Sequence, residues 1–303
     1  MKKILLVGKN GQIGWELLRT LAPLGPIVAL GRNDMDLANP DSIRRAVREV
    51  SPDLIVNAAA YTAVDQAESE PDLAMAVNGV APGILAEEAM RLNAMLIHFS
   101  TDYVFDGRKS EPYREEDQPN PLNVYGKTKL EGERAISAVG CAHLIFRISW
   151  IYGARGKNFL LTMLRLAGER DELRVVNDQI GAPTWSRFVA EAVGQALARN
   201  SRELAALSGI YHLTAAGSGS WYDFAKEIFG SDAICENRAV LGLRRDGPRI
   251  VPISSESYGA VAVRPANSVL SCEKVEEIFG IFRPEWRDFL ACCLKDFLVG
   301  KGC

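Results

Sequence analysis

The first half of the chain alternates short apolar runs with longer amphipathic stretches. Apolar runs at residues 1–7, 26–31, 54–57, 94–99 and 143–149 predict buried strands. Helical spacing covers residues 15–24, 72–92 and 125–138, and Asn39 and Pro40 provide the cap and first position of a further helix. This alternation predicts an α/β fold, a Rossmann-type doubly wound parallel sheet with right-handed crossovers.

The second half is mixed. Residues 158–167, 185–198 and 220–229 have helical patterns and residues 209–213 a strand pattern, whereas residues 238–267 are rich in Gly, Pro, Ser and Arg and predict long loops. We expect residues 1–151 to form the sheet domain, with 185–213 returning to it. Residues 152–184 and 214–303 are then a smaller mixed α/β lobe suited to substrate recognition.

A glycine-rich turn lies directly between the first predicted strand and the first helix. Gly8 and Gly11 allow a tight turn and the close approach of a phosphate, while Gly14 allows the helix to pack on the strand. The helix N-terminus adds free backbone N–H groups and a positive dipole end. The turn therefore predicts a dinucleotide site at the carboxyl end of the sheet, within an NAD(P)-binding domain.

Composition narrows the classes of protein. The chain has 303 residues, 48% hydrophobic and 24% charged, with a net charge of -3, which argues against a nucleic-acid or anionic-membrane partner. No apolar run reaches the ~18 residues of a membrane span and no cleavable leader is apparent, so we expect a cytoplasmic protein. Six cysteines without Cys-x-x-Cys spacing and three histidines suggest neither a disulfide framework nor a zinc site.

The candidate catalytic residues are Thr101, Tyr125 and Lys129. Tyr125 and Lys129 stand one helical turn apart near the start of a predicted helix, so they share a face. A free phenol has a pKa near 10, and a neighbouring ammonium lowers it toward neutrality. The Thr101 hydroxyl, at the end of an apolar strand, is a second donor for a substrate carbonyl oxygen.

The order of these motifs resembles the extended short-chain dehydrogenase/reductases. Six segments further resemble the dTDP-4-dehydrorhamnose reductase family: residues 8–17, 56–65, 100–105, 121–126, 147–150 and 177–184. Arg264, Pro265, Asn267 and Ser268 extend the match. The resemblance implies hydride transfer to carbon 4 of dTDP-4-dehydro-β-L-rhamnose, a small-molecule substrate, to give dTDP-L-rhamnose for polysaccharide biosynthesis.

The resemblance also implies residue roles. Tyr125 donates the proton, Lys129 holds the cofactor ribose and biases the phenol, and Thr101 hydrogen-bonds the reacting oxygen. Thr101 shares the substrate site with four further positions, Asp102, Tyr103, Trp150 and Gln179. Cofactor contacts, together with Tyr125 and Lys129, are expected at Gly8, Asn10, Gly11, Gln12, Ile13, Gly14, Arg32, Asp36, Leu37, Ala59, Ala60, Tyr61 and Thr62.

Two departures concern the cofactor and a metal. The second strand ends in Gly31-Arg32-Asn33-Asp34 rather than in an acidic residue, and an arginine attracts a 2′-phosphate. We therefore expect NADPH to be preferred, with NADH also accepted. Some family members bind Mg²⁺ between subunits; Glu16 matches one ligand, but Arg187 stands where another acidic ligand is expected, which argues against a metal. A homodimer is an open alternative to a monomer.

Several residues keep a structural interpretation beside the functional one. Trp150 suits the core as well as a sugar, Asp102 suits a turn cap, and residues 177–179 suit a polar turn. Arg147, a charge within an apolar strand, is either the buried partner of a carboxylate or a ligand of a substrate phosphate.

Alternative functions also remain. A reductase forming dTDP-6-deoxy-L-talose would act on the same ketone, and a sugar-nucleotide epimerase would share the fold. A non-catalytic regulatory subunit, like the reductase-like partner of methionine adenosyltransferase, is a different class. The presence of Thr101, Tyr125 and Lys129 argues against this last alternative.

Overall fold

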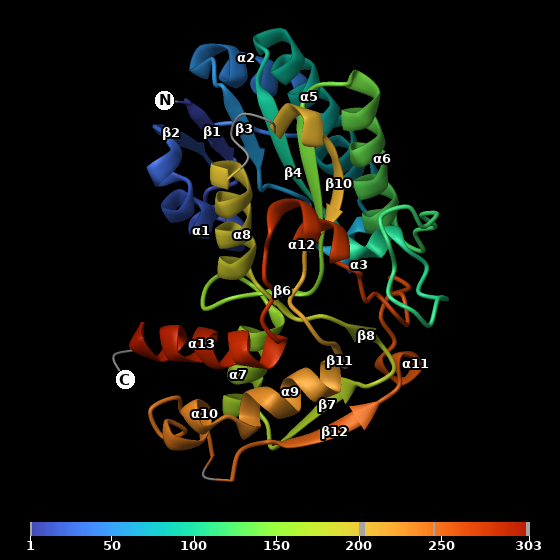
Figure 1. Ribbon diagram of the computed structural model, residues 1–303. Helices are drawn as coiled ribbons and strands as arrows, with labels where there is room; N and C mark the ends of the chain where they lie inside the picture. Colours follow the sequence, from blue (N-terminus) through green and yellow to red (C-terminus); the bar gives the residue numbers. More distant parts are fainter. Residues whose placement is uncertain (1, 200–203, 245, 301–303) are drawn as a thin grey trace.

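The central element is a six-stranded parallel sheet (Figure 1). The computed structural model describes residues 2–199, 204–244 and 246–300, so Met1 and residues 301–303 of the predicted lobe lie outside it. The sheet order is β10-β5-β4-β3-β1-β2. The strand bounds are β1 Ile4–Val7, β2 Ile27–Leu30, β3 Leu54–Asn57, β4 Met95–Thr101, β5 His143–Ile148 and β10 Gly209–His212.

The order reverses between β1 and β3, because β2 lies on one side of β1 and β3 to β5 lie on the other. Ligands of open α/β sheets bind beyond the strand ends at such a reversal. The glycine-rich turn follows β1 directly, so the topology places it at this point.

Helices cover both faces of the sheet (Figure 1). Side chains alternate along β1, so Ile4 and Leu6 join one core and Leu5 and Val7 the other. Packed pairs cover the two sides: α1 (Gln12–Thr20) lies against α8 (Ser186–Arg199), while α5 (Ala81–Leu92) contacts both α2 (Pro40–Val50) and α6 (Val124–Val139). Two short helices, α3 (Val64–Ala67) and α4 (Pro71–Met75), precede a π-helical turn that continues into α5.

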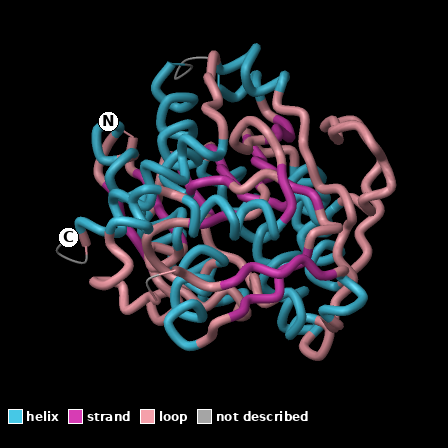
Figure 2. The backbone as a smooth tube through the Cα atoms, turned by 90° about the horizontal axis from the view of Figure 1, so that it is seen from below, coloured by secondary structure: helices cyan, strands magenta, loops and turns pink. Residues whose placement is uncertain are grey.

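Most of the remaining residues form a lobe below the sheet, built from helices, loops and short strands (Figures 1 and 2). Three two-stranded pairs occur there: β12 with β7, β11 with β8, and β6 with β9. The strand bounds are β6 Ile151–Tyr152, β7 Glu172–Val176, β8 Ile180–Gly181, β9 Thr184–Trp185, β11 Gly219–Ser220 and β12 Arg249–Ile253. The helix bounds are α7 Phe159–Glu169, α9 Trp221–Gly230, α10 Asp232–Glu236, α11 Ser255–Tyr258, α12 Glu273–Phe279 and α13 Trp286–Val299.

The prediction of long loops throughout residues 238–267 was wrong in part. Strand β12 and helix α11 lie inside that range, and β12 pairs in parallel with β7 from Arg249 opposite Glu172 to Ile253 opposite Val176. A five-residue strand that contains Pro252 gives a weak periodic signal. Helix α12, from the range predicted for the lobe, packs against β10 and α8. Among the described residues, no helix is long and apolar enough to cross a membrane.

Candidate active site

The turn after β1 is packed too tightly for side chains. Gly8 has φ +89°, and a Cβ there would lie 2.8 Å from the Ala59 backbone nitrogen. A Cβ on Gly14 would lie 2.0 Å from the Gly8 carbonyl oxygen, which confirms that this glycine brings α1 close to the end of β1. Gly11 precedes α1 and contributes no side-chain cap, so the first N–H groups of the helix remain available to an anion.

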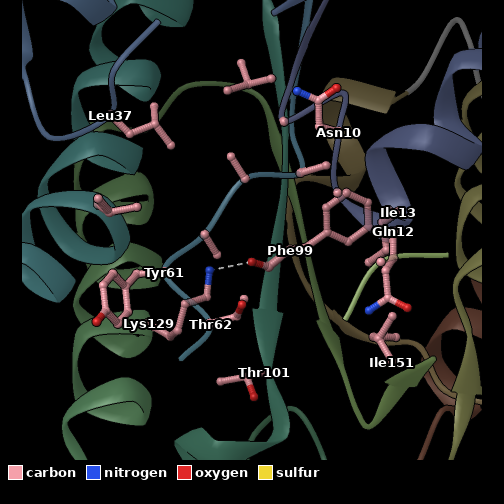
Figure 3. A pocket seen from close by; sticks show the side chains of 18 of the residues that line it. Asn10, Gln12, Ile13, Leu37, Tyr61, Thr62, Phe99, Thr101, Lys129 and Ile151 are labelled. Atoms are coloured by element: carbon pink, nitrogen blue, oxygen red, sulfur yellow. Dashed lines mark hydrogen bonds between the residues drawn. The ribbon is translucent and has the colours of Figure 1, made fainter. Parts of the chain in front are cut away.

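A cavity of about 700 Å³ extends from this turn to the end of β4 (Figure 3). Its volume suits a cofactor and part of a substrate. Among the predicted cofactor residues it is lined by Gly8, Asn10, Gly11, Gln12, Ile13, Arg32, Asp36, Leu37, Ala59, Ala60, Tyr61, Thr62, Tyr125 and Lys129. Gly14 does not line it, because Gly14 packs against Gly8 instead.

After β2, the exposed Arg32 and the carboxylate of Asp36 both line the cavity, whereas the nearby carboxylate of Asp34 does not. Asp34 accepts hydrogen bonds from Lys9 Nζ at 2.8 Å and from the Gly31 amide at 2.8 Å. Asp36 Oδ1 accepts from the Ala38 amide at 3.0 Å. Asp34 is therefore neutralised by Lys9, and Arg32 remains to attract a phosphate.

The three candidate catalytic residues line the far part of the same cavity. Thr101 ends β4, and Tyr125 is the second residue of α6, whose start is capped by Asn123 through the Gly126 amide at 2.8 Å. Burial raises the pKa of Tyr125 to about 12, against the lowering effect of a hydrogen bond with Thr101. The phenol is thus a protonated donor at neutral pH, and its pKa moves opposite to the direction predicted from sequence.

The contacts of Lys129 explain why the pKa of the Tyr125 phenol is not lowered. Its Nζ donates to the Phe99 carbonyl oxygen at 2.6 Å and lies 3.1 Å from His98 Nε2 (Figure 3 shows the first contact). Burial lowers the pKa of Lys129 to about 8, with Glu133 acting in the opposite direction. In this structure Lys129 therefore faces β4. Besides burial, the groups that shift the pKa of Tyr125 are Thr101 and Asp102.

Asp102 lines the cavity but is held from behind. Its carboxylate accepts from Thr101 Oγ1 at 3.0 Å and from Ser149 Oγ at 2.8 Å, with a further hydrogen bond to Ser268. Burial raises the pKa of Asp102 to about 6. The turn after β4 is capped by Thr101, which accepts from the Tyr103 amide at 3.1 Å, so the cap interpretation of Asp102 is wrong.

Trp150 lies at the junction of sheet and lobe. It has φ +47°, an unusual value for a large residue, and its indole stacks on Trp221 with centroids 3.5 Å apart and planes 4° apart. A Cβ on Gly181 would lie 2.4 Å from the Trp150 ring, so the absence of a side chain at Gly181 makes room for the indole. Trp150 is 9% exposed and yet lines the cavity, which makes it both a core residue and a wall of the site.

Two predicted substrate residues lie outside the first cavity. Tyr103 packs edge-on against Tyr125, with centroids 5.9 Å apart, and hydrogen-bonds Arg264. Gln179, predicted on a polar turn or a substrate-facing loop, is buried and lines a second cavity of about 630 Å³ in the lobe.

Of the two interpretations of Arg147, the structure supports the buried partner of a carboxylate. Its guanidinium forms a two-pronged ion pair with Glu133 of α6, at 3.0 and 2.7 Å, and both side chains are 2% exposed. Arg147 lines neither of the two cavities described here. It is a structural residue that ties β5 to α6.

The Glu16 position does not fit a metal. Its carboxylate is paired with Arg19 and with Arg187, and Arg187 also pairs with Asp296. Within the described ranges, no three or more His, Cys, Asp or Glu side chains are grouped so as to hold an ion. Independence from metal stays a prediction.

Sequence reasoning missed most of the second cavity. Its lining includes Phe159, Trp221, Arg170, Arg174 and Tyr258, of which none follows a recognisable motif. Arg264, quoted only for the family match, lines it too. In the first cavity it missed Gly156 and Lys157. The neighbouring Asn158 reaches over the glycine turn and donates to Gln12 Oε1 at 2.9 Å.

The chain is similar to proteins of known name. Residues 1–299 match the family model described as RmlD substrate binding domain. A protein of Burkholderia thailandensis named dTDP-4-dehydrorhamnose reductase is 50% identical over 299 residues, covering 98% of this chain and 99% of that protein. The chain belongs to the dTDP-4-dehydrorhamnose reductase family.

Solved structures agree with membership of the dTDP-4-dehydrorhamnose reductase family. The enzyme of that name from Bacillus anthracis, crystallised in complex with NADP, is 34% identical with a TM-score of 0.85, over 99% of both chains. A Thermus thermophilus UDP-glucose 4-epimerase, 18% identical with a TM-score of 0.77 over 98% and 99% of the chains, shares the fold alone. These findings confirm the predicted family, fold and oxidoreductase class, and they do not support the epimerase or the regulatory subunit.

Proposed function

We propose that this protein reduces carbon 4 of dTDP-4-dehydro-β-L-rhamnose to give dTDP-L-rhamnose, with NADPH preferred over NADH. The observation that carries the proposal is that two hydroxyl donors, Thr101 and Tyr125, line the same cavity as the glycine-rich turn. The family name and the NADP complex of a relative support the substrate and the cofactor.

The residues present fit a phosphorylated dinucleotide. The turn at Gly8 leaves room for no Cβ, the first turn of α1 has no side-chain cap, and Arg32 stands where a 2′-phosphate is expected. The bound cofactor supplies the hydride. Asn158, the N-cap of α7, donates to the Gln12 side chain at the start of α1 and so links the lobe to the cofactor cavity.

The protein's own part in the reaction is to hold and transfer a proton. Thr101 and Tyr125 donate hydrogen bonds to the substrate carbonyl oxygen, which becomes an alkoxide as carbon 4 accepts the hydride, and the Tyr125 hydroxyl proton moves to that oxygen. A pKa of about 12 keeps this proton on the phenol until an alkoxide of higher basicity forms. The single hydrogen of the Thr101 hydroxyl is directed at Asp102 Oδ1, 3.0 Å away, so it must turn from Asp102 to the carbonyl oxygen when the substrate binds.

The nucleotide part of the substrate would occupy the second cavity. Arg170 and Arg174 there offer positive charge for a diphosphate, with Glu172 as the lining carboxylate, whereas the lining Arg264 is already paired with Asp65 at 2.7 Å. Phe159 and Trp221 offer aromatic surface for a base or a deoxysugar. Because Trp150 lines one cavity and its stacking partner Trp221 the other, the sugar lies beside this pair.

The test is a matched pair of tyrosine variants. Tyr125→Phe should lower kcat/KM for the keto-sugar nucleotide by about 10²–10⁴-fold and leave NADPH binding intact. Tyr113→Phe is the control, since Tyr113 is a buried tyrosine that lines neither cavity and donates its hydroxyl to Asp106 at 2.9 Å. NMR identification of the product distinguishes rhamnose from talose. Undiminished turnover by Tyr125→Phe would overturn the proposal.

A further inference from the structure

A chain of three buried polar side chains lies behind the catalytic residues. Asn57 at the end of β3 stands opposite His98 of β4 in the sheet register, and Lys129 reaches them from α6. Their exposures are 1%, 1% and 2%. Asn57 Nδ2 lies 3.1 Å from His98 Nδ1, and His98 Nε2 lies 3.1 Å from Lys129 Nζ. Of the three, only Lys129 has a role implied by the family resemblance, which is to hold the cofactor ribose.

The orientation of the Asn57 amide is determined by the backbone. The Ala59 amide donates to Asn57 Oδ1 at 3.2 Å, so Nδ2 is the atom that faces His98. An amide nitrogen can only donate, and His98 Nδ1 must therefore accept. A neutral imidazole that accepts at Nδ1 carries its hydrogen on Nε2.

This tautomer restricts the charge of Lys129. The hydrogen on His98 Nε2 is directed at Lys129 Nζ, and an ammonium group has three donors and no acceptor. An amine has a lone pair that accepts this hydrogen while it still donates to the Phe99 carbonyl. Every hydrogen bond in the chain is satisfied only when Lys129 is an amine, and an unsatisfied buried polar contact is costly.

The charged groups around the lysine are compatible with this arrangement. Burial, and secondly the charge of Lys129, lowers the pKa of His98 well below its usual value, so the imidazole is neutral. On α6, the Glu133 carboxylate raises the pKa of Lys129 but is already paired with Arg147 of β5. On the cavity side stand Asp102 and Tyr125, which interact with each other.

We propose that Asn57 and His98 are positioning residues that hold the Nε2–H tautomer of the imidazole and thereby favour the amine form of Lys129. Protonating Lys129 then requires the imidazole hydrogen to move from Nε2 to Nδ1 and the Asn57 amide to turn, which breaks its bond to Ala59. The charge of Lys129, which the family resemblance places at the cofactor ribose, is in this way coupled to the tautomer of the adjoining His98 and, through it, to Asn57 on the next strand.

The experiment is ¹⁵N NMR of the imidazole groups in the cofactor-free protein. The chain has only three histidines, and loss of one signal in His98→Gln assigns His98. We expect a protonated Nε2 and an unprotonated Nδ1 in the wild type. In Asn57→Asp a carboxylate oxygen replaces Nδ2 and can still accept from Ala59, so the hydrogen should move to Nδ1.

The pH titration of the His98 signals reports the ionisation of its neighbour Lys129. We expect the midpoint to rise by about one pH unit or more in Asn57→Asp, a tenfold change in proton affinity. Asn57→Leu adds no charge and removes the same donor, so a smaller rise in this variant separates the tautomer effect from simple attraction to a carboxylate. In the enzyme assay, the limb of the pH profile that depends on Lys129 should move by the same amounts.

A wild-type His98 protonated at Nδ1 would overturn the proposal, as would a midpoint that rises in Asn57→Asp but not in Asn57→Leu. The wild-type spectrum decides even where a variant fails to fold. Because no substrate is needed, this result is independent of the Tyr125→Phe assay that tests the proposed function.

Discussion

The two cavities of this protein are built in different ways. The first is lined by segments that follow successive strands of one sheet, such as Gly8 after β1, Ala59 after β3 and Thr101 at the end of β4. The second is lined by α7, β7, the first residue of α9 and residues 253–264, which only short strand pairs bring together. The proposed cofactor site is therefore built from contiguous motifs, and the proposed site for the nucleotide part of the substrate from dispersed residues.

The packing around the glycines shows the same difference. Around Gly8 and Gly14 the backbone leaves no space for a Cβ, whereas Gly230, Gly242 and Gly259 of the lobe have no atom within 4 Å of where a Cβ would stand. The sheet half thus depends on backbone contacts that almost any substitution disturbs. The lobe also has tightly packed glycines, but there the nearest atoms belong to side chains: a Cβ on Gly181 would meet the Trp150 ring, and one on Gly217 the Glu285 carboxylate.

The largest expected effect concerns two arginines. Arg147→Met should lower the free energy of unfolding by about 3–5 kcal/mol, because Glu133 is left as a buried, unpaired charge. Arg244→Met removes an exposed ion pair with Asp171 in the lobe and should change the free energy of unfolding by less than about 1 kcal/mol. Chemical denaturation measures both, and equal losses would contradict the distinction between the halves.

The second effect concerns two glycines in helices. Gly14→Ala puts a Cβ 2.0 Å from the Gly8 carbonyl oxygen, so we expect a loss of about 1–3 kcal/mol in unfolding free energy and at least tenfold weaker NADPH binding. Gly168→Ala in α7 meets its nearest atom at 3.7 Å and should stabilise the fold by up to about 1 kcal/mol. Denaturation and a fluorescence titration with NADPH decide; unimpaired binding by Gly14→Ala would count against a backbone-built site.

The third effect separates the ligands of the two cavities. Arg32→Asp should raise KM for NADPH about tenfold, since a carboxylate repels the 2′-phosphate, and should leave KM for the sugar nucleotide unchanged. Trp221→Ala should raise KM for the sugar nucleotide and leave KM for NADPH unchanged, because an aromatic face is lost. Trp221→Phe should have an intermediate effect. Steady-state kinetics with each substrate varied in turn measures both, and a clear preference of the wild type for NADH would refute the assignment of Arg32.

The smallest expected effect is that of a chelator, which we expect to be nil. Arg19 and Arg187 already neutralise Glu16, and Arg187 also neutralises Asp296. EDTA should leave both the rate and the melting temperature unchanged. A rate that falls with EDTA and returns with Mg²⁺ would show that a cation binds where the arginines now pair.

The sequence predicted the sheet half well and the lobe only in part: the patterns at residues 158–167 and 220–229 correspond to helices α7 and α9, whereas other elements of the lobe were missed. The first five strands of the sheet each produced an apolar run, and the residue types at Gly8, Thr101 and Tyr125 are dictated by local requirements. Strand β12 was not predicted, because Pro252 and the exposed positions of the strand interrupt the hydrophobic period. Trp221 was not predicted as a site residue, because nothing in the local sequence distinguishes an aromatic residue that stacks on Trp150 from one in a core.

By itself, the sequence determined the order of strands and helices, the phosphate-binding turn and the three catalytic candidates, because these depend on local periodicity and on short spacings. Only the tertiary structure decided that Arg147 pairs with Glu133, that Asp102 is held by Ser149, and that Lys129 faces His98 rather than the phenol. Each of these outcomes is a choice of partner between different elements of the fold. Such choices depend on burial and hydrogen-bond geometry, which no spacing along the chain encodes.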